Sequence, residues 1–149
     1  MATLTQESEV QTLNLSKSTF IKATPERVFA SVLEQMGPGS EMMDGTPFKM
    51  KLEAWPGGRW FRDLGNNAGH LWGHVQVIKP PMLLEITGPL FMSYPAISHL
   101  QYRVTAEGAG SKLTLTHTAM GLIPAEHREG VQQGWEHWMG MVQKRAEGR

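Results

Sequence analysis

The chain has 149 residues, of which 40% are hydrophobic, and its 14 lysines and arginines balance its 14 aspartates and glutamates. This length predicts one domain, and the balanced charge lacks the basic surface of a nucleic-acid-binding protein. Because there is no cysteine, disulfides, thiolate metal sites and a cysteine nucleophile are excluded. We expect a cytoplasmic domain over residues 12–149, without a membrane span, that follows a flexible polar arm over residues 1–11.

A strand and then a short helix are predicted near the start. Hydrophobic and polar residues alternate over residues 12–21, as they do in a strand with one buried face. Thr24 is a favourable helix N-cap, and Pro25 suits the first helical position because an N–H would have no helical partner there. We expect this helix to end at the glycine-proline-glycine turn of residues 37–39.

The middle of the chain predicts about six further strands. Turn residues separate the strand-like segments, which cover residues 48–55, 59–64, 70–78, 82–87, 97–105 and 112–119. The loop over residues 88–96 is apolar, and its Phe91, Met92 and Tyr94 suit either the cover of a cavity entrance or a dimer contact. Both interpretations stay open.

An amphipathic helix is predicted to close the chain, from about residue 124 to 144. Val131, Trp135, Trp138 and Val142 recur at four-three-four spacing, which places them on one helical stripe. The order of strand, helix, about six strands and helix is typical of an α+β domain with an antiparallel sheet. We expect this last helix to lie across the concave face of the sheet and to bury all four side chains.

A family resemblance rests on six segments that occur in a fixed order, at residues 23–29, 56–60, 69–73, 79–81, 111–117 and 134–135. With them the chain resembles the SRPBCC superfamily, which includes START-like domains, and within it the homologues of the activator of the large heat-shock chaperone's ATPase. The resemblance implies the helix-grip fold, in which a curved antiparallel sheet of about seven strands wraps around a long C-terminal helix, with a short helix after the first strand. It also implies a cavity between sheet and helix. Members of the superfamily bind lipids, hormones or polyketides, and a few are cyclases or hydrolases.

The six histidines predict no metal site and no other cofactor. His70 and His74 are four residues apart on a predicted strand, which separates them by about 13 Å at about 3.3 Å per residue. Two ligands of one metal ion must lie much closer together. His117 shares a strand face with Leu113, Leu115 and Ala119, so it is either a satisfied core residue or a polar group that orients a ligand in the cavity.

Two further features bear on the predicted site: the orientation of the strand that contains Trp72, and two glycines on the closing helix. Trp72 and His74 share one face of their strand, and either face could point inward. On the closing helix, Gly134 and Gly140 each cost about 1 kcal/mol of helix propensity. Such costs indicate that the sheet or a ligand approaches the helix closely.

The sequence favours a binding domain for a small hydrophobic molecule. The predicted lining provides apolar walls, with His117 and Tyr102 orienting the ligand, and consists of Trp60, Trp72, Met92, Tyr102, His117, Trp135 and Trp138. One alternative is a cyclase or hydrolase that uses His117 with His74, although no catalytic motif is present. The other is a module that modulates a chaperone ATPase. A homodimer or a chaperone contact is compatible with the apolar loop, and no nucleic-acid partner is expected.

Overall fold

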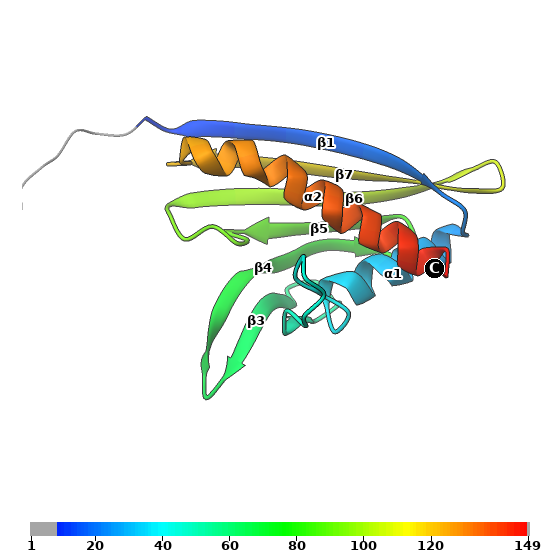
Figure 1. The fold of residues 1–149 in the computed structure, drawn as a ribbon, viewed down its shortest axis with the longest axis horizontal. Coiled ribbons are helices and arrows are strands. Elements are labelled where there is room, and N and C mark those ends of the chain that lie inside the picture. The colour runs from blue at the N-terminus through cyan, green and yellow to red at the C-terminus, as the bar shows by residue number, and fades with distance from the viewer. Residues whose placement is uncertain (1–8, 149) are drawn as a thin grey trace, which may run out of the picture.

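The computed structural model describes residues 9–148. In this range the elements are β1 (Gln11–Ile21), α1 (Pro25–Met36), β2 (Met50–Leu52), β3 (Arg59–Gly65), β4 (Ala68–Lys79), β5 (Leu83–Gly88), β6 (Ala96–Glu107), β7 (Gly110–Gly121) and α2 (Ala125–Ala146). The strands form one antiparallel sheet in the order β1-β7-β6-β5-β4-β3-β2. The curved sheet wraps around α2, and α1 lies beside the C-terminal half of that helix (Figure 1). The predicted helix-grip fold is confirmed.

The first two elements follow the predicted pattern closely. In β1, Leu13 and Ile21 are buried, and the strand begins at Gln11, one residue before the predicted boundary. Residues 1–8 of the predicted arm lie outside the described residues. The Thr24 hydroxyl accepts a hydrogen bond from the Arg27 backbone N–H at 3.2 Å, which caps α1 as expected.

The core lies between the sheet and the two helices. Strands β6 and β7 supply alternating buried residues, among them Leu100, Tyr102, Leu113 and Leu115. Helix α2 buries five side chains against them: Val131, Trp135, Met139, Val142 and Ala146.

One residue of the predicted stripe on α2 differs from the expectation. Trp138 is only half-buried, and Met139 takes the fully buried place. At about 100° per residue, Met139 lies closer than Trp138 to the centre of the buried stripe. Trp138 therefore lies at the edge of the core, where its ring can face a cavity.

The strand predicted over residues 48–55 is mostly wrong, because β2 contains only Met50–Leu52. Lys49 has a φ of 58°, which lies in the left-handed region and cannot continue an extended strand. Phe48 thus precedes the sheet and belongs to the long connection between α1 and β2. That connection forms one side of the pocket described below.

A β-bulge in β4 decides the question of which face Trp72 occupies. Trp60 pairs with Gly73 and Phe61 pairs with Leu71, so Trp72 is an extra residue on β4. The bulge breaks the two-residue alternation. Trp72 consequently points inward and is 6% exposed, whereas His74 is exposed. Over residues 9–148, neither helix has the length and apolar character needed to cross a bilayer.

Candidate ligand-binding pocket

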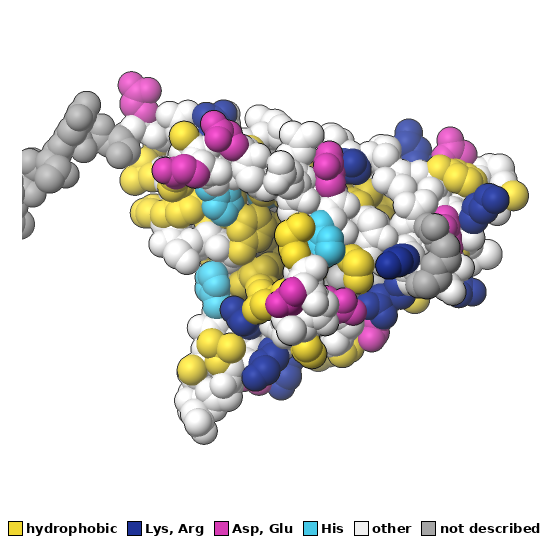
Figure 2. Space-filling model, in the orientation of Figure 1, with side chains coloured by type: hydrophobic (Ala, Val, Ile, Leu, Met, Phe, Trp, Pro, Cys, Tyr) yellow, Lys and Arg dark blue, Asp and Glu magenta, His cyan; other side chains and the backbone are white. Residues whose placement is uncertain are grey.

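A pocket of about 460 Å³ lies between α2 and the sheet. Four parts of the chain form its walls: the α1–β2 connection with Met42, Met43 and Phe48, strand β4 with Trp72, the β5–β6 loop with Phe91, and the part of α2 from His127 to Trp138. Hydrophobic side chains gather in the recess beside α2 in the space-filling view (Figure 2). The volume falls in the range of roughly 300–1,000 Å³ that is typical of small-molecule sites.

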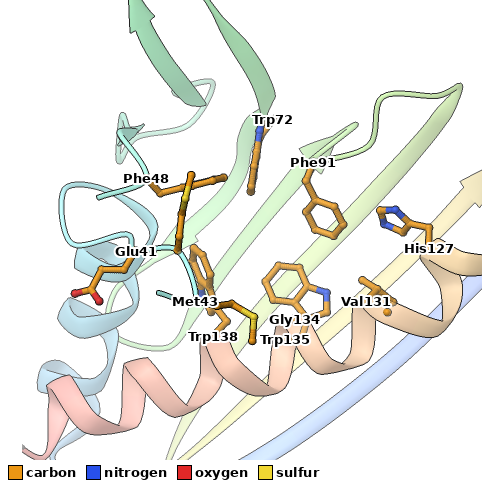
Figure 3. A pocket seen from close by; sticks show the side chains of 12 residues that line it. Glu41, Met43, Phe48, Trp72, Phe91, His127, Val131, Gly134, Trp135 and Trp138 are labelled. Carbon is orange, nitrogen blue, oxygen red and sulfur yellow. The ribbon is translucent and has the colours of Figure 1, made fainter. Parts of the chain in front are cut away.

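Aromatic rings form a continuous wall around this space (Figure 3). The ring centroids lie 5.6 Å apart for Phe48 and Trp72, 5.6 Å for Trp72 and Phe91, and 6.0 Å for Phe91 and Trp135. Trp135 and Trp138 follow at 5.9 Å. All four contacts are edge-to-face, the arrangement that aromatic pairs favour. Each ring is thus held in place by its neighbours.

The indole N–H groups of two wall residues are bonded to histidines. Trp135 donates to Nδ1 of His117 at 3.0 Å, and Trp72 donates to Nδ1 of His70 at 3.2 Å. These donors are satisfied within the protein, so Trp72 and Trp135 offer the pocket mainly their apolar ring surfaces.

His117 is a buried support behind the wall. It is 0% exposed, and its Nε2 lies 2.9 Å from Oγ of Ser98. Because Nδ1 accepts the Trp135 N–H, Nε2 carries the hydrogen and donates it to Ser98. The Ser98 hydroxyl in turn donates to the Met92 sulfur at 3.9 Å. Burial lowers the pKa of His117 to about 4, with a smaller contribution from the charge of His127, and so keeps the imidazole neutral.

The structure places three of the seven predicted lining residues, Trp72, Trp135 and Trp138, in the pocket wall. The other four are buried and do not line it. Trp60 lies behind Trp72, with centroids 5.0 Å apart, and donates its indole N–H to the Met36 carbonyl at 2.8 Å. Met92 and His117 belong to the hydrogen-bonded chain behind Trp135. Ligand binding in the pocket remains a prediction.

Tyr102 is the fourth buried residue, and it stands behind Trp138. Burial raises the pKa of its hydroxyl, and the Trp138 indole lowers it by a smaller amount. The phenol therefore stays protonated. His74 and His117, the pair considered for catalysis, are not brought together, because His74 is exposed on β4 and His117 is buried on β7.

Sequence reasoning missed several lining residues. His127 stacks on Phe91, with centroids 5.1 Å apart at 14°, and meets the Tyr94 ring edge-on at 5.2 Å. Burial lowers the pKa of His127. A signal was present, because His127, Val131 and Trp135 follow one another at four-residue spacing on α2 and so share a face. The Met42–Met43 pair in the α1–β2 connection carried no periodic signal.

The lining has little charge. Glu41 is its one acidic side chain, and neither lysine nor arginine is among the lining residues. Within the described part of the chain, no group of three or more His, Asp or Glu side chains could hold a metal ion. Most of the lining is apolar, and the His127 Nε2 atom is a buried polar atom without a hydrogen-bond partner.

Comparison with known proteins adds the family. The model of the family described as "Activator of Hsp90 ATPase homolog 1-like protein" matches residues 22–147. The chain belongs to this family. The predicted relation to the SRPBCC superfamily is thereby confirmed. A comparison with curated proteins gives no match.

Solved structures with the same fold have low sequence identity. An uncharacterized protein from Rhizobium leguminosarum is 18% identical, with a TM-score of 0.75 over 97% of this chain and 100% of that one. Ara h 8.0201 is 11% identical, with a TM-score of 0.65 over 93% and 100%. The di-domain ARO/CYC StfQ from the steffimycin biosynthetic pathway is 10% identical, with a TM-score of 0.63 over 92% of this chain and 50% of StfQ. These likenesses show the fold.

Proposed function

We propose that this chain binds a small hydrophobic molecule in the pocket between α2 and the sheet. The observation that carries the proposal is the open space of about 460 Å³ bordered by the rings of Phe48, Trp72, Phe91, Trp135 and Trp138. A core that needed only stability would close around these rings, because contact between apolar side chains stabilises the fold. Here the rings instead border free volume.

The rigidity of the wall supports the same proposal. Edge-to-face contacts fix the rings, and the His117 and His70 hydrogen bonds fix the orientation of two indoles. Side chains that their neighbours already hold in place need little reordering on binding, which lowers the entropic cost of association. The pocket is therefore preorganised for an apolar guest.

The proposal is tested with N-phenyl-1-naphthylamine, an uncharged fluorophore whose emission rises in apolar surroundings. We expect saturable binding by the wild type and about tenfold weaker binding by Phe91→Ala, since about 1.4 kcal/mol of lost contact corresponds to that factor. Phe20→Ala is the matched control, because Phe20 is exposed and does not line the pocket. Folded protein without saturable binding, or equal losses in both variants, contradicts the proposal.

Native mass spectrometry of protein isolated from its own cells gives a second readout. We expect the folded protein to carry an additional small mass. A dimer without a retained small molecule contradicts the proposal and favours a protein contact at this face. In the described residues we find no comparable observation that favours a cyclase, a hydrolase or a chaperone module.

A further inference from the structure

Two glycines of α2, Gly130 and Gly134, border the pocket. Glycine within a helix costs about 1 kcal/mol relative to alanine, so its presence in a helix calls for a physical reason. Neither glycine has a left-handed backbone conformation, and a Cβ built on either one meets no atom within 4 Å. Backbone geometry and close packing therefore do not require glycine at these positions.

The two positions lie on the pocket face of the helix. His127, Val131 and Trp135 recur at four-residue intervals, as do Gly130, Gly134 and Trp138, and all six line the pocket, as expected for one side of a helix. A side chain at Gly134 would extend from the same part of α2 that faces the Trp72 and Phe91 rings (Figure 3), and Gly130 lines the pocket one turn earlier on the helix. Both glycines are exposed, and no protein atom lies within 4 Å of a Cβ at either position, so the missing side chains leave this edge of the pocket open.

The proposed ligand site is the aromatic pocket, and Gly130 and Gly134 determine how much space is available in it beside α2. We infer that Gly130 and Gly134 select a flat, uncharged apolar ligand that lies against the bare backbone of α2, an inference that rests on the proposed function. A flat ring system fits between a helix without side chains and a wall of aromatic rings. It also loses less conformational entropy on binding than a flexible chain.

The charge of the lining supports an uncharged ligand. Glu41 contributes a carboxylate, and the lining has no lysine or arginine that could pair with an anion. An anionic group would lose its hydration in the pocket without a compensating partner. The same ring system should therefore bind more weakly when it carries a negative charge.

Gly140 provides a matched control within the same helix. A Cβ at Gly140 also meets no atom within 4 Å, but Gly140 does not line the pocket. Gly130→Ala, Gly134→Ala and Gly140→Ala should each raise the melting temperature by about 2–4 °C through helix propensity. We therefore expect a similar change in stability in all three variants, whereas only Gly130→Ala and Gly134→Ala add a side chain at the pocket.

The experiment compares the affinity of each variant for N-phenyl-1-naphthylamine. We expect Gly130→Ala and Gly134→Ala to bind about tenfold more weakly than the wild type, which corresponds to about 1.4 kcal/mol, and Gly140→Ala to bind as the wild type does. We also expect the sulfonated counterpart, 8-anilinonaphthalene-1-sulfonate, to bind the wild type about tenfold more weakly than the uncharged probe.

The outcomes separate this inference from the proposed function. If the folded wild type binds neither probe, the proposed function fails and the inference falls with it. If the wild type binds the uncharged probe and Gly134→Ala binds it equally well, the width-setting role is wrong while the proposed function stands. An equal loss in Gly140→Ala also overturns that role, and tighter binding of the sulfonated probe overturns the uncharged class.

Discussion

The indole N–H of Trp135 donates to Nδ1 of His117 across 3.0 Å, and this bond joins the pocket wall to the core of the sheet. Trp135 lines the pocket from α2, whereas His117 is buried on β7. The imidazole also bonds to Ser98 on β6. The neutral imidazole of His117 on β7 thus links Trp135 on α2 to Ser98 on β6.

His117→Leu should destabilise the protein by about 2–4 kcal/mol, because it leaves the buried Trp135 N–H and Ser98 hydroxyl without their partner. Urea unfolding measures the loss. His117→Gln offers an acceptor and a donor on one side chain and should restore part of the stability. Equal stability of His117→Leu and the wild type would contradict the role of this bond.

A double-mutant cycle isolates the bond between the two residues. Trp135→Phe removes the donor, so His117→Leu in that background should cost about 1 kcal/mol less than in the wild type. The free energies of unfolding of the four proteins give the coupling. Additive losses would show that His117 and Trp135 do not act through each other.

Stability should decrease as the pH falls from about 6.5 to about 4. The pKa of His117 is lowered to about 4 in the folded protein, against an ordinary value of 6.5, so in this window the unfolded chain binds a proton that the folded chain excludes. At about 1.36 kcal/mol per pKa unit, the loss is on the order of 3 kcal/mol. Protonation would also place a second donor opposite the Trp135 N–H.

Unfolding measured across this pH range checks the expectation. His117→Gln should flatten the dependence, and His127→Gln should flatten it less, because His127 is only partly buried and its pKa is lowered in the same direction. A profile that is unchanged by His117→Gln would assign the dependence to other groups.

Met43→Ala should weaken the binding of N-phenyl-1-naphthylamine about threefold to tenfold with little change in stability. Met43 is 73% exposed and yet lines the pocket. Its flexible thioether can therefore contact a ligand but contributes little to the packing of the fold. Met82→Ala is the control, since Met82 is also exposed and lies outside the lining. A large drop in the melting temperature of Met43→Ala would contradict this division of roles.

The fold was largely predictable from the sequence because alternation and helical periodicity report burial directly. Leu113 and Leu115 on β7, and Val131 and Trp135 on α2, lie inside as their spacing predicts. Two of the differences occur where a single backbone feature interrupts the period. The left-handed Lys49 shortens β2, and the bulge at Trp72 turns that ring inward while His74 stays outside.

The candidate site was less predictable than the core. Residue parity places a side chain on a face, but it does not show whether a neighbour covers that face. Trp60 and His117 point inward as expected, and other side chains then separate them from the pocket. Met43 lines the pocket from a connection without a regular period, and Phe48, which the alternation assigns to a strand, lies in the same connection, so their positions could be known only from the three-dimensional fold.

The most direct test of the central claim follows the five tryptophan indole N–H signals by two-dimensional ¹⁵N–¹H NMR during titration with N-phenyl-1-naphthylamine. Trp72, Trp135 and Trp138 line the pocket, whereas Trp55 is 58% exposed and outside it. We predict that the signals of the three lining residues shift with a common saturation curve while the Trp55 signal stays in place. Saturable shifts confined to Trp55, or no shifts at saturating probe, would contradict a binding site in this pocket.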